Sequence, residues 1–96
     1  MRVKGFDWDA GNWPKCGKHG LSKSAIEPVF RNDPFVLADP FPVEVRMRAI
    51  GNTDAGRWVF VVFTIRGRED GAYIRPVSAR YMHKKEVEHF VRQQQK

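Results

Sequence analysis

Three short runs of the sequence bring together side chains that handle phosphate. The run Lys18-His19-Gly20-Leu21-Ser22 places an imidazole beside an ammonium at a break between two short helical patterns. Arg66, in Phe63-Thr64-Ile65-Arg66-Gly67, and Arg80, in Val77-Ser78-Ala79-Arg80, place guanidinium groups at the ends of apolar strands. An imidazole titrates near neutrality and can transfer protons, whereas a guanidinium keeps its charge and fits two phosphate oxygens. The three runs therefore indicate a site for a phosphate ester.

The composition is that of a small, basic, folded domain. With 96 residues we expect one domain over 1–96, with a frayed tail from about residue 93. Hydrophobic residues make up 42% of the chain, which excludes an intrinsically disordered protein. Seventeen Lys and Arg residues against eleven Asp and Glu give a net charge of +6. Such a charge attracts polyanions, and a nucleic acid, a membrane surface or an acidic protein would each fit.

The cysteine count and the apolar runs limit the cellular setting. Cys16 is the only cysteine, so an intrachain disulfide is excluded. The first eight residues lack the apolar centre of a signal peptide, and the longest apolar run, residues 58–65, is too short to span a membrane. We therefore expect a soluble cytoplasmic protein that does not act at a membrane. Cys16-x-x-His19 has the spacing of half a metal site, but the other histidines lie far along the chain, so no metal or other cofactor is expected.

Two short helices are expected in the first third of the chain. Residues 7–18 are polar and weakly helical, and Gly20 can end that helix in the left-handed conformation. Ser22 or Ser24 can cap a second helix, which ends before Pro34.

Strands follow, and a basic helix over residues 82–95 closes the chain. The third strand is apolar on both faces and should be central, whereas Pro76 lacks an N–H and favours a bulge or an edge position in the fourth. The four expected strands are residues 35–38, 43–50, 57–66 and 72–79. This order predicts an α+β fold with a four-stranded, mainly antiparallel sheet and all three helices on one face.

The other face of that sheet should be partly open. Residues 43–50 alternate, with Arg46 and Arg48 pointing away from the helices. We expect an apolar centre with a cationic rim, and an exposed patch of that kind usually marks a site for a partner.

Further motifs give the sequence a family resemblance. In chain order they are Phe6-Asp7-Trp8-Asp9, Lys18-His19-Gly20-Leu21-Ser22, Asp33-Pro34, Arg46-x-x-Ala49-Ile50-Gly51, Gly56-Arg57, Val62-Phe63-Thr64-x-Arg66-Gly67, Ile74-Arg75-x-x-Ser78-Ala79-Arg80, then Glu86 and Phe90. Their order and spacing over residues 6–90 resemble the BrnT family of bacterial toxins. The resemblance implies a RelE-like fold and a ribonuclease that forms the toxin half of a type II toxin–antitoxin pair. It also implies a ribbon-helix-helix antitoxin, a heterotetramer of the two proteins, and operator DNA bound only through the antitoxin.

Internal cleavage of RNA defines what the site residues must do. The 2′-hydroxyl loses a proton, the pentavalent phosphate needs its charge neutralised, and the leaving 5′-oxygen gains a proton. His19 is the candidate acid and base, a role worth about 10²–10⁴-fold, and Lys18 and Arg80 complete the candidate catalytic set without a metal. The candidate RNA and phosphate contacts are Arg66, Arg75, Arg46, Arg48, Lys84 and Lys85.

Structural interpretations of the same residues stay open. A histidine before a glycine, such as His19, is common at a helix C-terminus, and Arg66 fits a solvated strand end. Lys15 stands where the family usually has Asn, and Tyr81 stands where it usually has a second arginine. A catalytically inactive basic module that binds nucleic acid or protein is therefore the alternative to an endoribonuclease.

Overall fold

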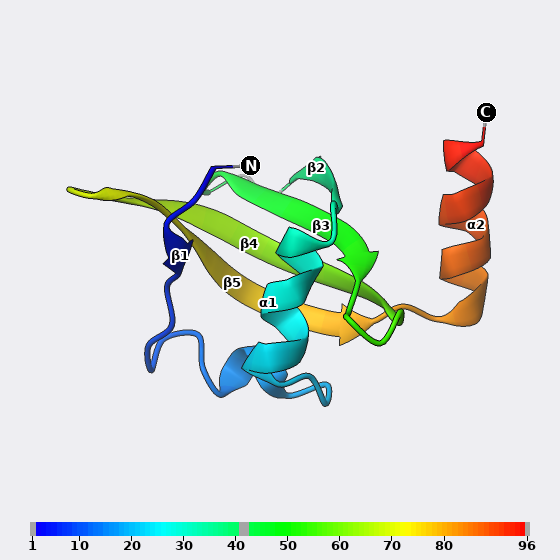
Figure 1. Cartoon of the computed structure of the whole chain (residues 1–96), viewed down its shortest axis with the longest axis horizontal. Helices are drawn as coiled ribbons and strands as arrows, with labels where there is room; N and C mark the ends of the chain where they lie inside the picture. Colours follow the sequence, from blue (N-terminus) through cyan, green and yellow to red (C-terminus); the bar gives the residue numbers. More distant parts are fainter. Residues whose placement is uncertain (1, 41–42, 96) are drawn as a thin grey trace.

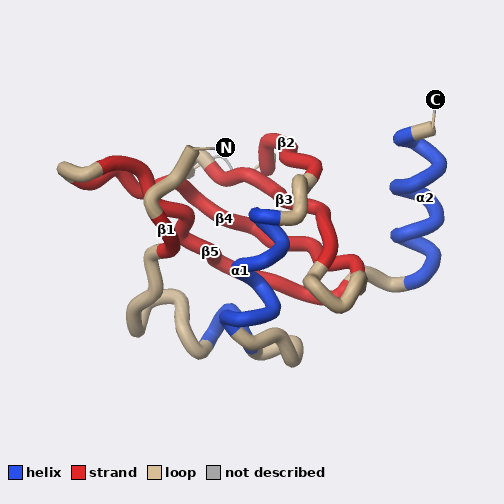
Figure 2. Tube along the Cα trace, in the orientation of Figure 1, coloured by secondary structure: helices blue, strands red, loops and turns tan. Residues whose placement is uncertain are grey.

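The computed structural model describes residues 2–40 and 43–95, and the strands of this part form one five-stranded sheet. The strands are β1 (Gly5–Phe6), β2 (Phe35–Asp39), β3 (Arg46–Asn52), β4 (Trp58–Arg68) and β5 (Gly71–Tyr81). The helices are the one-turn 3-10 helix η1 (Lys15–Gly17) and the α-helices α1 (Lys23–Arg31) and α2 (Lys84–Gln94). The strand order is β1-β5-β4-β3-β2; β1 runs parallel to β5, and the other neighbours are antiparallel (Figures 1 and 2).

The predicted fold was wrong in the first of its two N-terminal helices and in its sheet. Residues 7–18 form turns and a single 3-10 turn in place of a helix, because Asp9 and Asn12 bond locally to the backbone and compete with helical hydrogen bonds. The sheet is mixed and has a fifth strand, β1, which the sequence analysis missed. A two-residue strand has no readable alternation, and it forms only because β5 supplies its partner, as in the bond from the Lys4 N–H to the Ala72 carbonyl at 2.8 Å.

The long central strand agrees with the sequence pattern. β4 lies third of five, as predicted for a strand that is apolar on both faces. The predicted bulge near Pro76 is also present, because the pairing of β4 with β5 shifts by one residue between Val62, opposite Ser78, and Phe63, opposite Pro76. Val77 is thus the extra residue on β5, and the side chains before and after it change face relative to a regular strand.

α1 covers one face of the sheet and builds the core there (Figure 1). The helix begins at Ser22, whose hydroxyl accepts the Ala25 N–H at 3.1 Å. Ile26 and Val29 are fully buried on its inner side, against a sheet surface that includes Phe63. This layer holds the N-terminal segment and the loop before α1 in place.

α2 does not join α1, so the prediction of all helices on one face was wrong. The Phe90 ring meets the Phe35 and Trp58 rings at centroid distances of 5.6 and 5.5 Å. Phe35 pairs with Ile50, next to the core residue Ala49, and therefore points away from α1. Figure 1 shows α2 standing at one end of the sheet, beyond the strands. The apolar stripe of α2 is narrow, and none of its residues is fully buried. The periodicity of its apolar residues alone therefore could not predict which face of the sheet the helix packs against.

Candidate functional site

The face of the sheet away from α1 carries most of the candidate arginines. We call this surface the arginine face, and define it by Phe60, Val62 and Thr64 of β4 with Arg48, Arg75 and Arg80 of the adjoining strands. Arg48 lies opposite Val62 on β3, and Arg80 lies opposite Phe60 on β5. The predicted apolar centre with a cationic rim is therefore found on the predicted side of β3.

Two arginines flank one aromatic ring at the centre of this face. The Arg80 guanidinium lies 4.9 Å, and the Arg48 guanidinium 5.6 Å, from the centroid of the Phe60 ring. Both distances are within the range of cation–π attraction. The sequence analysis selected the two arginines but not Phe60, because only the strand register shows that they share its ring.

Carboxylates hold both guanidinium groups in place. Arg48 donates to Asp39 at 2.6 Å, and Arg80 donates through two nitrogens to Glu86 of α2 at 2.8 and 2.9 Å. Glu86 also accepts the His83 backbone N–H at 2.9 Å. Hydrogen bonding from Arg80, and then from His83, lowers the pKa of Glu86 to about 2 and raises the pKa of Arg80. The pair therefore stays ionised at neutral pH and gives Arg80 a fixed orientation.

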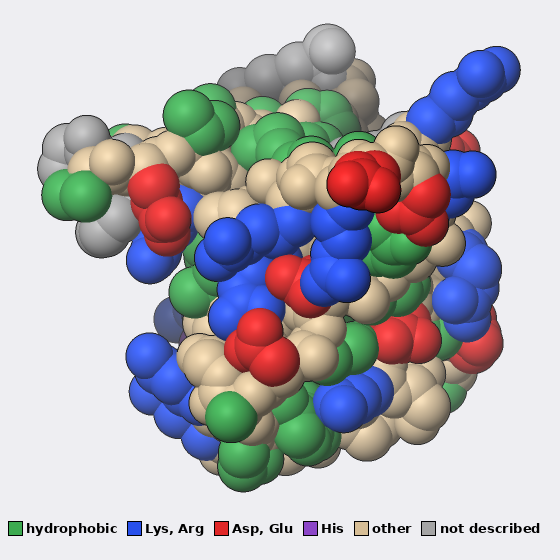
Figure 3. All heavy atoms as spheres, turned by 90° about the vertical axis from the view of Figure 1, so that its left-hand side faces the viewer, with side chains coloured by type: hydrophobic (Ala, Val, Ile, Leu, Met, Phe, Trp, Pro, Cys, Tyr) green, Lys and Arg blue, Asp and Glu red, His purple; other side chains and the backbone are tan. Residues whose placement is uncertain are grey.

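The bulge at Val77 brings Arg75 to the same face, where it joins an ion-pair network. Its guanidinium donates to Asp7 at 3.1 Å and to Asp9 at 3.0 and 2.9 Å, and Arg68 also binds Asp7. Figure 3 views the end of the molecule with the β4–β5 hairpin and shows cationic side chains gathered around acidic ones. The hydrogen bonds between Arg75 and Asp9 lower the pKa of Asp9 and raise that of Arg75. With 13% of its side chain exposed, Arg75 ties the segment after β1 to β5.

The other candidate arginines differ in their surroundings. Arg66 is exposed, and no hydrogen bond or ion pair holds it within the described part of the chain. It lies opposite Tyr73, six positions along β4 from Phe60, so its backbone is about 20 Å from that of Arg80 at ~3.3 Å per residue. Arg46 donates to Glu44 at 2.8 Å near the end of β3. The bulge at Val77 shifts the pairing of β4 with β5 by only one residue, so Arg66 and Arg80 remain at opposite ends of the arginine face.

The run with the histidine lies on another part of the molecule. Lys18 and His19 occupy an exposed turn between η1 and α1, and Gly20 follows with φ +94°, as expected for a left-handed residue that ends a helical turn. The preceding Cys16 is buried in the core, which raises the pKa of its thiol to about 11. Among residues 2–40 and 43–95, no hydrogen bond or ion pair joins Lys18 or His19 to an arginine.

The remaining candidates and the acidic groups complete the surface. Lys84 and Lys85 are exposed in the first turn of α2, next to the Arg80–Glu86 pair. In the described ranges, no group of three or more His, Cys, Asp or Glu side chains is placed to hold a metal ion. No helix within these ranges is long and apolar enough to cross a membrane. The acidic partners Asp7, Asp9 and Glu86 were missed as site residues, although all three stand within the quoted motifs.

The comparison with known families now adds to this geometry. A family model described as the ribonuclease toxin BrnT of type II toxin–antitoxin systems matches residues 8–86. The match runs from the segment that binds Arg75 to the glutamate that binds Arg80, and it confirms the predicted resemblance. No curated protein sequence matches the chain. Since the family model covers most of its 96 residues, the chain belongs to the BrnT family of ribonuclease toxins of type II toxin–antitoxin systems.

Proposed function

We propose that this chain is a metal-independent endoribonuclease that inhibits translation by cutting RNA. The observation that supports this most strongly is the arginine face, where Arg48 and Arg80 flank Phe60 and keep fixed orientations. A cationic surface with a central ring fits single-stranded RNA, which is held by its phosphates and by stacking of its bases.

An RNA strand would lie along β4. Arg66 at one end of the face is exposed, and Arg80 with Lys84 and Lys85 lies at the other. The ~20 Å between the two ends lets one strand place several phosphates on the face at once. Arg75 contributes less to binding than the sequence predicts, because two carboxylates hold its guanidinium and only 13% of its side chain is exposed, whereas Arg80 has one carboxylate partner and is 38% exposed.

Cleavage would follow the chemistry of metal-independent ribonucleases. His19 takes the proton from the 2′-hydroxyl, and the 2′-oxygen attacks phosphorus. The bond to the 5′-oxygen breaks, and the protonated His19 returns its proton to that oxygen, which leaves a 2′,3′-cyclic phosphate and a free 5′-hydroxyl. Lys18, next to His19, would stabilise the charge of the pentavalent phosphate, and Arg80 would hold another phosphate of the same RNA strand on the arginine face. Exposure supports these roles, since the Lys18 and His19 side chains are open to a substrate.

The protein antitoxin would bind the apolar part of the arginine face. A groove of about 450 Å³ separates α2 from the sheet and exposes apolar side chains; its lining includes Phe35, Leu37, Ile50, Phe60 and Phe90. A segment of a ribbon-helix-helix antitoxin in this groove would cover Phe60 and block access to Arg80. Two toxins and two antitoxins would form the heterotetramer, which would bind operator DNA through the antitoxin.

An inactive binding module of the same fold is the second candidate. It is favoured by the carboxylates that already hold Arg75 and Arg80, and by the lack of contact between His19 and the arginines in the described residues. Incubation of purified protein with total RNA in EDTA separates the two candidates. We expect fragments with 2′,3′-cyclic phosphate ends; intact RNA at micromolar protein would favour the binding module.

A further inference from the structure

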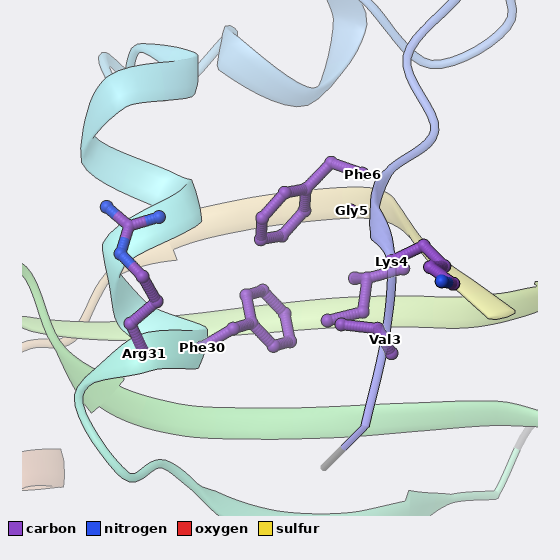
Figure 4. A pocket seen from close by; sticks show the side chains of 7 residues that line it. Val3, Lys4, Gly5, Phe6, Phe30 and Arg31 are labelled. Carbon is purple, nitrogen blue, oxygen red and sulfur yellow. The ribbon is translucent and has the colours of Figure 1, made fainter. Parts of the chain in front are cut away.

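A second cleft lies on the side of the sheet that α1 covers. It separates the β1 segment from the end of α1 and has a volume of about 410 Å³ (Figure 4). We call it the β1–α1 cleft; its lining residues are Val3, Lys4, Gly5, Phe6, Phe30, Arg31 and Ile74. It belongs to the opposite side of the sheet from the arginine face, because Phe6 pairs with Ile74, a buried member of the core under α1.

The floor of the cleft is apolar and well supported. Phe6 and Phe30 pack edge to face with ring centroids 5.6 Å apart, and Phe30 meets Phe63 in the same way at 5.0 Å. Figure 4 shows the two labelled rings between β1 and α1, with Val3 beside them. Rings held in this way form a firm surface, and the volume is enough for one or two large apolar side chains.

The rims of the cleft are positive. Figure 4 shows Arg31 on the α1 side and Lys4 on the β1 side. Both residues are exposed, and in the described ranges neither side chain has a carboxylate partner. None of the described residues that line the cleft is acidic, and Arg2 adds a third cation in the hollow next to it. This differs from the arginine face, where carboxylates hold Arg48 and Arg80.

We propose that the β1–α1 cleft anchors an acidic, amphipathic segment of the protein antitoxin. A large apolar side chain would fill the cleft, and carboxylates on either side of it would pair with Lys4 and Arg31. The lining favours a protein segment over RNA, because its charged side chains stand only at the rims, whereas on the arginine face two guanidinium groups lie against the ring itself. The assignment to the antitoxin rests on the proposed function.

The position of the cleft defines what the anchor does. Because it lies away from the arginine face, a segment bound there adds affinity without covering Phe60 or Arg80. Loss of the anchor should therefore weaken the complex, while saturating antitoxin still stops RNA cleavage completely.

Charge reversal at the rim tests the proposal. The dissociation constant of the toxin–antitoxin complex is measured for Arg31→Glu and Lys4→Glu, with Arg92→Glu as the matched control. Arg31 and Arg92 each stand in the last turn of an α-helix and are exposed. Arg31→Glu and Arg92→Glu therefore change the net charge equally, and each places a carboxylate at the unfavourable end of a helix dipole. We expect at least tenfold weaker binding for each rim variant, a smaller salt dependence, and less than a twofold change for the control.

A variant of the floor and an activity assay complete the test. Val3→Asp should also weaken the complex at least tenfold, because it places a carboxylate where the apolar side chain would bind. Equal dissociation constants for Arg31→Glu and Arg92→Glu would overturn the proposal, as would a loss of RNA affinity in Arg31→Glu without a loss of antitoxin affinity. If the wild-type protein did not cleave RNA but the rim variants still bound antitoxin weakly, the anchor would stand and the ribonuclease proposal would fail.

Discussion

The Arg80–Glu86 pair should stabilise the fold by an amount that depends on pH in a defined direction. Two hydrogen bonds of 2.8 and 2.9 Å link the groups, and the pKa of Glu86 falls from 4.5 to about 2. A shift of this size would correspond to about 3 kcal/mol at a buried site. The side chains are 38% and 37% exposed, so solvent screening reduces the expected value to about 1 kcal/mol.

The sign follows from the lowered pKa. The unfolded chain has the ordinary pKa of Glu86, so the stabilisation is complete above about pH 5 and is lost as the pH falls toward 2. A double-mutant cycle of Arg80→Met and Glu86→Gln, followed by urea unfolding with tryptophan fluorescence, isolates the pair. We expect a coupling free energy of about 1 kcal/mol at pH 7 and nearly zero at pH 2. A coupling that is absent at pH 7, or unchanged at pH 2, would refute the reasoning.

Three further predictions concern residues with contrasting surroundings. Arg75→Ala should destabilise the fold by about 2 kcal/mol in urea unfolding, because it leaves the buried Asp7 with one partner fewer, and its RNA affinity should change little. Arg66→Ala should do the opposite and weaken RNA binding several-fold in a filter-binding assay, with an unchanged free energy of unfolding; identical profiles for the two variants would contradict both assignments. Cys16, whose buried thiol has a pKa of about 11, should react with iodoacetamide at pH 8 at least tenfold more slowly in the folded than in the urea-unfolded chain.

Local signals explain what could be predicted from the sequence. The alternation of polar and apolar residues around Arg46 and Arg48 predicted the face of the sheet on which these arginines lie. The apolar run of β4 predicted its central position in the sheet. Both signals can be read from the residues of a single strand. Pro76 marked the bulge, since a missing N–H is a local property. The family motifs could be recognised because their order along the chain does not depend on the tertiary contacts.

Contacts between distant residues account for what was missed. β1 has two residues and exists only through its pairing with β5, 68 positions further along the chain, as in Gly5 opposite Tyr73. Asp9 binds Arg75 from a comparable separation, so its role could not be read from its own neighbourhood. Phe60 meets Arg48 and Arg80 only after the strand register and the bulge are fixed. These pairings are set by the packing of the whole sheet.

The most direct test of the proposed ribonuclease measures kcat/KM on a short RNA that the wild-type protein cleaves in EDTA. His19→Ala and Arg80→Ala should each lower kcat/KM at least tenfold, about 1.4 kcal/mol of transition-state stabilisation, while the exposed control Arg92→Ala cleaves normally. His19→Ala should also retain the wild-type free energy of unfolding, because its side chain is exposed and unbonded in the described structure. Normal cleavage by His19→Ala would contradict the account, since His19 would then only end a helical turn.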